Sequence, residues 1–180
     1  MNLRPVCIYS AEPVDVAEEI QRVILSAFQE RPIVAGALTL QPSPHTLIGT
    51  ETNMFVDAVE QTFDMTLLDQ DIRIIATPSE YTLDYGDGTS LGPSAASGGP
   101  LPEQQWGEPT QTSHVYDSTG DFSVSATVYF SGRYSINGGP MVPIDGRASV
   151  DAVPRQLSVW RAETRSVADD CLVNPVGAGC

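Results

Sequence analysis

The longest regular pattern in this sequence is an alternation of apolar and other residues over Asp121–Phe130. One set of alternate positions is entirely apolar: Phe122, Val124, Ala126, Val128 and Phe130. A period of two residues belongs to a β-strand that turns one face toward a core and the other toward water. We therefore expect the longest strand of the protein in this segment.

The same period of two residues recurs from about Ala37 onward. The further strands that it predicts are Ala37–Gln41, Thr46–Thr50, Asn53–Val59, Phe63–Leu68, Ile72–Thr77 and Tyr81–Tyr85. Pro42, Pro44, Gly49 and Pro78 punctuate this series, because Pro and Gly favour turns over positions inside a ladder. The 15 Gly and 14 Pro among 180 residues fit short strands joined by many turns. The sequence therefore predicts one mainly β domain, with at most a small appendage.

Two hairpins complete this pattern. Leu67–Ile72 fits a tight turn between two strands, and Asn137-Gly138 is a strong hairpin signal near the C-terminal end of the domain. Later apolar positions complete the sheets: Ile144, Ala148, Val150, Leu157 and Val159. Trp160 is expected to pack in the core or at a strand edge.

A different pattern precedes the strands. Residues Asp15–Glu30 carry apolar side chains at i, i+3 and i+4 spacing, which predicts an amphipathic helix that ends at Pro32. Asp15 and Glu18 form a capping-box pair at its start. The helix could pack on its own domain, bridge to a segment upstream or contact another helix, and the first is the commonest outcome. We divide the chain into an N-terminal segment 1–36, a β-domain 37–165 and a C-terminal tail 166–180.

The charge of the chain narrows the choice of partners. The formal net charge is −14, and all nine basic residues are arginine. Nucleic acids and anionic lipid surfaces both require clustered cations, so neither is an expected partner. No apolar run is long enough to span a bilayer. We therefore expect no nucleic-acid partner and no insertion of this chain into a membrane.

The compartment is inferred from the cysteines. The N-terminal residues lack the apolar stretch of an export signal, so either the chain is cytosolic or the signal lies outside this sequence. Cys171 and Cys180 flank an eight-residue loop rich in Pro and Gly, and a disulfide between them would hold the terminus. The alternative is two unpaired thiols. Cys7 has no expected partner, and the predicted disulfide favours an extracellular or envelope location.

One sequence pattern points to catalysis. Gly88–Gly92 fits the G-x-S-x-G pattern of a hydrolase nucleophile elbow, with Ser90 as the nucleophile. The elbow requires a helix after the serine, and the Pro, Ser and Gly residues that follow cannot form one. We therefore interpret this pattern as a set of turn residues and expect no enzymatic activity.

Calcium is the one metal ion whose binding the sequence leaves possible. Zinc is not expected, because His45 and His114 lie far apart and the cysteines lack companion ligands. Acidic residues gather at predicted turns, and the best candidate calcium ligands are Asp84, Asp87, Asp117 and Asp121. A solvated acidic surface is the simpler interpretation, since exposed carboxylates are common. We therefore expect no obligatory cofactor.

A long segment, Leu91–Gln111, lacks alternation and is predicted to be a surface loop. It contains Trp106 among polar residues, close to Gln104 and Gln105. An exposed Trp beside amide side chains is typical of surfaces that bind carbohydrate or protein. The alternative is that Trp106 anchors the loop to its own domain. Trp106, Gln104 and Gln105 are therefore candidate binding residues.

Two motifs carry the most specific information, one in Leu83–Thr89 and one in His114–Val124. They resemble the two halves of the polycystic kidney disease (PKD) domain, whose motifs are Trp-x-Phe-Gly-Asp-Gly and His-x-Tyr-x-x-x-Gly-x-Tyr/Phe-x-Val. The residues that match are Gly86, Asp87, Gly88, His114, Tyr116, Gly120 and Phe122. Leu83 stands in place of the Trp, and Tyr85 in place of the Phe.

The resemblance implies an immunoglobulin-like β-sandwich, to which the N-terminal helix and the C-terminal hairpin are additions. Gly86 and Gly88 would supply the positive φ of a sharp turn, and Asp87 would bond back to backbone N–H groups. Tyr116 and Phe122 would bury their rings on facing strands, with the tyrosine hydroxyl directed to a partner. His114 is expected to form a structural hydrogen bond.

The resemblance also implies a function. PKD domains are mostly non-catalytic and occur on cell surfaces and in secreted proteins, and this chain is similar to actinobacterial surface proteins with such a domain. It implies a spacer, or an adhesion module that contacts protein or glycan at the cell surface. Two alternatives are an accessory domain that binds carbohydrate or another ligand, with or without calcium, and a subunit of an envelope assembly docked through its N-terminal helix.

Overall fold

The computed structural model describes residues 15–163 and 171–177. This part of the chain is mainly β, with two sheets and one α-helix, an arrangement consistent with a β-sandwich. The expectation of a mainly β domain preceded by a helix is thus confirmed. No helix among these residues is both long enough and apolar enough to cross a membrane.

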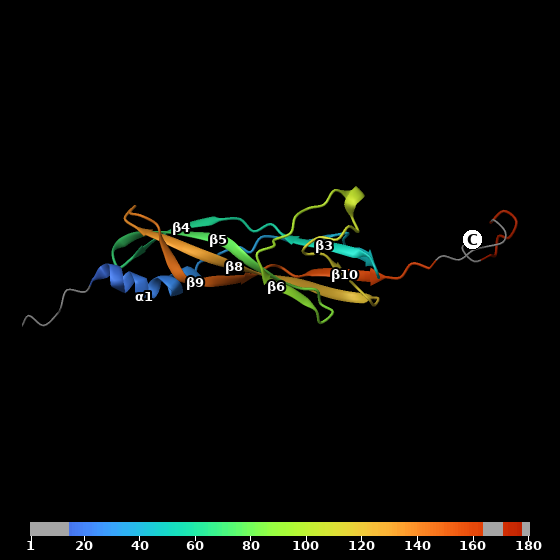
Figure 1. The fold of residues 1–180 in the computed structure, drawn as a ribbon, viewed down its shortest axis with the longest axis horizontal. Coiled ribbons are helices and arrows are strands. Elements are labelled where there is room, and N and C mark those ends of the chain that lie inside the picture. The colour runs from blue at the N-terminus through green and yellow to red at the C-terminus, as the bar shows by residue number, and fades with distance from the viewer. Residues whose placement is uncertain (1–14, 164–170, 178–180) are drawn as a thin grey trace, which may run out of the picture.

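The described elements run along an elongated molecule (Figure 1). In chain order they are α1 (Val16–Gln29), β1 (Leu38–Gln41), β2 (His45–Leu47), β3 (Glu51–Val56), β4 (Gln61–Leu67), β5 (Gln70–Asp84), β6 (Ser90–Ser94), the 3-10 helix η1 (Glu103–Gln105), β7 (His114–Val115), β8 (Gly120–Ile136), β9 (Val142–Asp151) and β10 (Arg155–Trp160). The small sheet has the order β1-β3-β7, and the large sheet has the order β2-β10-β8-β5-β4, with β6 on β5 and β9 on β8.

The long strands β5 and β8 form the axis of the molecule. They pair antiparallel from Ile72 opposite Ile136 to Asp84 opposite Ser125. Their outer edges are each shared by two shorter strands: β4 and β6 pair with successive parts of β5, while β10 and β9 pair with successive parts of β8. One ladder therefore connects an end built from α1, β4 and β9 to an end built from the small sheet, β2 and β10 (Figure 1).

The continuity of β5 differs from the sequence prediction. Two strands were expected, Ile72–Thr77 and Tyr81–Tyr85, because Pro78 cannot donate a ladder hydrogen bond. The structure instead carries one strand through the proline, with an irregularity in the pairing with β8 between Pro78 and Glu80. The β4 ladder has already ended at Ala76, so the missing N–H lies where β5 changes edge partner.

The loop prediction Leu91–Gln111 was also wrong at its start. Leu91–Ser94 belongs to β6, which pairs with β5 at an outer edge of the sheet. An edge strand tolerates Pro93, and this proline and the neighbouring glycine hid the strand from an alternation analysis. The hairpin expected at Asn137-Gly138 is present, with positive φ at both residues.

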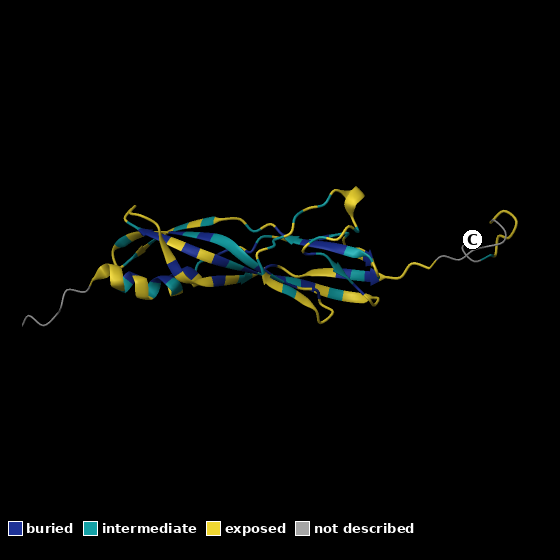
Figure 2. Ribbon diagram, in the orientation of Figure 1, coloured by how far each residue is buried: buried dark blue, intermediate teal, exposed yellow. Residues whose placement is uncertain are grey.

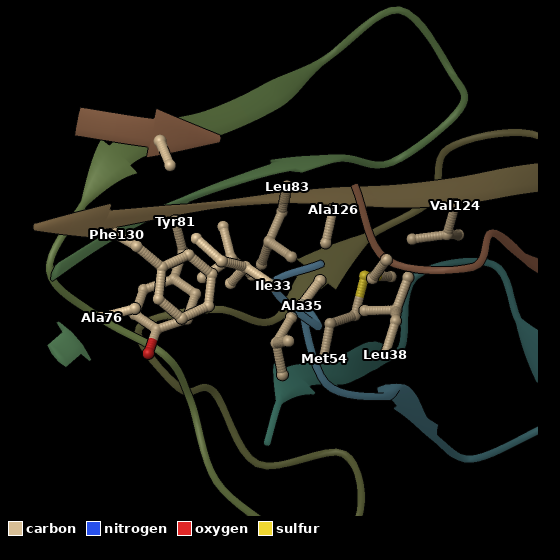
Figure 3. Packing of buried hydrophobic residues seen from close by; sticks show 14 of the residues in the cluster. Ile33, Ala35, Leu38, Met54, Ala76, Tyr81, Leu83, Val124, Ala126 and Phe130 are labelled. Atoms are coloured by element: carbon tan, nitrogen blue, oxygen red, sulfur yellow. The ribbon is translucent and has the colours of Figure 1, made fainter. Parts of the chain in front are cut away.

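The core lies on the inward faces of the strands, and buried and exposed residues alternate along β5 and β8 (Figure 2). At the end that carries both sheets, Leu38 and Met54 of the small sheet lie opposite Leu83 and Ala126 of the large sheet (Figure 3). All four side chains are at most 3% exposed. Burial of apolar surface between the two sheets is therefore what holds this end together.

Helix α1 covers the large sheet at the other end of the molecule. It begins after Asp15, whose carboxylate accepts a hydrogen bond from the Ala17 N–H at 2.9 Å. Its apolar face is buried, and Phe28 is 0% exposed. Gly132 of β8 makes room for this ring, since a Cβ there would lie 3.1 Å from two of its carbons. The helix thus packs on its own domain, and this face is not available for docking to another protein.

Removal of the Phe28 ring tests this packing. We expect Phe28→Ala to lower the free energy of unfolding by about 3–5 kcal/mol, because the ring is wholly buried and leaves a cavity. Val16→Ala, on the same helix but at an exposed position, is the matched control. Urea denaturation followed by circular dichroism measures both variants. Equal stabilities of Phe28→Ala and the control would mean that α1 does not pack on the sheet.

Candidate functional site

The residues of the two PKD-like motifs meet where β5 ends. The His114 ring, at the start of β7, stacks on Tyr85 with 4.1 Å between the centroids and 6° between the planes. Tyr116 lies edge-on to His114 at 4.7 Å and contacts Phe122 of β8 at 4.8 Å. The four rings therefore join the ends of β5, β7 and β8, which belong to different sheets.

Asp87 ties the Gly-Asp-Gly turn to this aromatic cluster. Its Oδ2 lies 2.6 Å from Nε2 of His114, and its Oδ1 accepts hydrogen bonds from the Thr89 N–H at 3.0 Å and the Thr89 hydroxyl at 2.6 Å. Burial raises the pKa of Asp87, but the bonds from Thr89 and His114 outweigh it, so the pKa lies below its ordinary value. The fold therefore favours the charged carboxylate.

Tyr116 is the buried centre of the cluster. Its side chain is 0% exposed, and its hydroxyl donates a hydrogen bond to the Tyr85 carbonyl at 2.9 Å. Burial, followed by the negative charge of Asp87, raises the pKa of Tyr116 well above its ordinary value. The hydroxyl therefore stays protonated and serves as a donor that holds the backbone at the end of β5.

The two glycines of the turn have different requirements. Gly86 has φ +81°, and a Cβ there would lie 2.7 Å from the Ser123 carbonyl oxygen, so the position needs both the left-handed backbone and the missing side chain. Gly88 has φ +91° with open space around it, so only its backbone conformation favours glycine. The turn therefore packs directly against β8.

The carboxylates named for calcium are not gathered into a metal centre. Asp84 accepts a hydrogen bond from the Gly86 N–H at 2.9 Å, and Asp121 accepts one from the Ser158 hydroxyl at 2.5 Å. Within residues 15–163 and 171–177, no group of three or more His, Cys, Asp or Glu side chains could hold a metal ion. Asp117 is exposed in the turn that precedes β8. Asp84 and Asp87 thus hold the turn after β5, and Asp121 bonds to the neighbouring strand β10.

The structure places Trp106, Gln104 and Gln105 together in an exposed part of the long loop. Gln104 and Gln105 lie in η1, and Trp106 follows it with 41% of its surface exposed. The indole Nε1–H points back to the Leu101 carbonyl at 3.3 Å, within the same loop. Trp106 therefore contacts the loop itself and remains open on the surface.

Two polar residues of the small sheet anchor this loop, and sequence analysis did not identify them. Asn53 is 1% exposed, donates to the Gly99 carbonyl at 2.9 Å and accepts from the Thr110 hydroxyl at 2.9 Å. Gln41 accepts from the Leu101 N–H at 2.8 Å and donates to its carbonyl at 3.1 Å. The sequence signal was that Gln41 and Asn53 are amide residues within predicted strands. A polar side chain that is buried in a strand needs a hydrogen-bond partner.

The predicted disulfide concerns the C-terminal tail. Cys180 and Cys7 lie outside the described residues. The pairing of Cys171 with Cys180 therefore stays a prediction.

The anchoring of the loop can be tested by two substitutions. We expect Asn53→Leu, which is nearly isosteric, to cost about 2–3 kcal/mol of unfolding free energy, because it leaves buried loop groups without partners. It should also speed cleavage between Gly92 and Gln111 by a broad-specificity protease. Trp106→Ala should change the stability by less than about 1 kcal/mol, since Trp106 is exposed. The opposite ranking of the two variants would identify Trp106 as the anchor.

Asp87 predicts a particular dependence of stability on pH. Because the fold lowers its pKa, the unfolded chain takes up the proton first as the pH falls, so its contribution is full above about pH 5 and is lost at lower pH. We expect Asp87→Asn to lower stability by about 1–2 kcal/mol at pH 7 and to flatten this acid-side loss.

Urea denaturation at several pH values measures the effect of Asp87. Asp117→Asn removes the same formal charge from an exposed position and is the matched control. A parent and an Asp87→Asn variant that lose stability in parallel below about pH 5 would show that the fold does not hold Asp87 in its charged form.

Comparison with known proteins does not assign the chain to a family. No family model matches the sequence, and neither a curated protein nor a solved structure matches the chain. The resemblance to PKD domains therefore rests on the residues of the two motifs, and the function has to be inferred from the molecule itself.

Proposed function

We propose that this chain is a non-catalytic module of the PKD type that works outside the cell as a rigid spacer between two attached partners. The observation that carries the proposal is that helix α1 and the end of β10 lie at opposite ends of the molecule. Helix α1 lies at one end of the long axis, and the chain leaves β10 at the other (Figure 1). Anything joined to the two ends is held apart by the full length of the β5–β8 ladder.

The pairing of β5 and β8 supports the rigidity of such a spacer. β8 has 17 residues, which corresponds to about 55 Å at the usual rise of a strand. Both of its edges are hydrogen-bonded through most of this length, to β5 on one side and to β10 and then β9 on the other. The shared ladder leaves no unpaired linker between the two ends, so they are expected to move as one body.

The use of the motif residues supports the non-catalytic part of the proposal. Tyr116 and Asp87 are both engaged in bonds that close the end of the sandwich. Ser90 begins strand β6, whereas a nucleophile elbow requires a helix at this point. The acidic composition, with no cationic cluster in the sequence, favours surface partners other than nucleic acids.

A distance measurement between spin labels tests the spacer. With the native cysteines replaced by serine, labels at Ser118→Cys and Pro140→Cys lie just beyond the two ends of β8. We expect one narrow distribution centred at about 50–60 Å, because the strand fixes the separation. Labels at Leu68→Cys and Pro140→Cys, in two turns at the same end, are the control and should give a short distance. A broad distribution for the first pair would show a hinge and contradict a rigid spacer.

A further inference from the structure

An exposed tryptophan lies on the outer face of the large sheet where β10 ends. In β10 the side chains of Leu157 and Val159 are buried, so Ser158 and Trp160 point to the opposite face. Trp160 is 59% exposed, more than any other aromatic side chain described as exposed in the structure. Of the two positions expected for Trp160, the core is therefore excluded, and a strand edge is compatible with its exposure.

Trp160 has an apolar hollow on one side. In the register of β10 with β2, Trp160 lies beside Leu47, and Ser158 lies beside His45. The hollow has a volume of about 470 Å³ and is lined by Pro42, His45, Leu47 and Trp160 among others. The His45 ring meets the indole edge-on at 5.6 Å and 77°, which braces the tryptophan ring.

Trp160 also lines a second hollow, of different chemistry. This hollow, of about 350 Å³, includes Thr119, Asp121, Ser158 and Arg161. Asp121 of β8 lies opposite Ser158 and accepts a hydrogen bond from its hydroxyl at 2.5 Å. Among the described residues no other group bonds to the Asp121 carboxylate, which leaves acceptor capacity toward solvent. The Trp160 ring thus lies between an apolar hollow on one side and a hollow lined by hydroxyl, carboxylate and guanidinium groups on the other.

We propose that this face binds a neutral glycan of hexopyranose units, with one sugar ring stacked on Trp160. A pyranose ring has an apolar C–H face and a rim of hydroxyl groups, which matches the indole and the neighbouring polar side chains. Ligand sites commonly combine an apolar surface with a few placed polar groups. Asp121 and Ser158 would accept hydrogen bonds from the hydroxyl rim, because the one proton of the Ser158 hydroxyl is already given to Asp121. The Arg161 guanidinium, which lines the same hollow, would donate.

Two observations favour a glycan over a peptide or an anionic polymer. At Ser158 and Val159, next to Trp160, the backbone of β10 is paired on both sides, with β2 and β8, so it offers a peptide strand no ladder to extend there. Asp121 in the site and the net charge of −14 oppose a polyanion. The row of polar side chains continues along the same face through Gln156 and Ser123, which lie opposite each other and are both exposed. This row suits an extended chain of sugars.

Single-tryptophan proteins test the proposal directly. The chain has two Trp residues, so Trp106→Phe leaves Trp160 as the reporter and Trp160→Phe leaves Trp106 as the matched control. Cellohexaose and chitohexaose are the neutral probes, and hexagalacturonate is the anionic one. In the Trp106→Phe protein we expect saturable quenching or a blue shift of emission with a neutral probe at concentrations up to about 10 mM. Adding Asp121→Asn should weaken the affinity about fivefold.

The remaining outcomes overturn the proposal. A response from Trp106 alone, a response only to hexagalacturonate, or no response to any probe would each contradict it. Emission of Trp160 that shifts with protein concentration in the absence of sugar would show that a second copy covers the site. Emission typical of a buried indole at every concentration would show that the chain itself covers it. Binding at this face is independent of the spacer role, since the spin-label distances do not involve Trp160.

Discussion

The antiparallel pairing of β5 and β8 is the interaction on which the rest of the structure depends. It runs from Ile72 opposite Ile136 to Asp84 opposite Ser125, and every other strand of the large sheet is attached to it directly or through β10. Backbone hydrogen bonds along two strands of this length leave few ways for one end to move against the other. The helix end and the two-sheet end are therefore parts of one elongated body, although each has its own edge strands.

At one end of this ladder the two sheets are joined by an aromatic cluster, which consists of Tyr85, His114, Tyr116 and Phe122. It joins the turn after β5 to β7, the edge strand of the small sheet, and so closes the two sheets on each other. Asp87 adds a charge-assisted bond to His114, and such bonds are stronger than neutral ones. The residues that look most like a functional motif in the sequence thus stabilise the fold.

The two tryptophans are both exposed, but different parts of the structure hold them in place. Trp106 lies in a loop that Gln41 and Asn53 of the small sheet hold through hydrogen bonds to other loop residues. Trp160 ends a strand that pairs with β2 and β8, and it is itself paired with Leu47 of β2, so its position is fixed by the sheet. A rigid strand positions a ligand-binding side chain more accurately than a loop does. For this reason the outer face of the large sheet is the better candidate for recognition.

The sequence by itself determined the local features of this protein. Alternation located most strands from Ala37 onward, the apolar spacing after Asp15 located the helix, and Asn137-Gly138 located a hairpin, because each of these depends on neighbouring residues alone. Only the tertiary structure decided that β5 passes through Pro78, that Asn53 anchors the long loop and that Trp160 faces solvent. These features depend on which strands and loops lie side by side. The residues next to a position in the sequence do not show which distant segment it will contact.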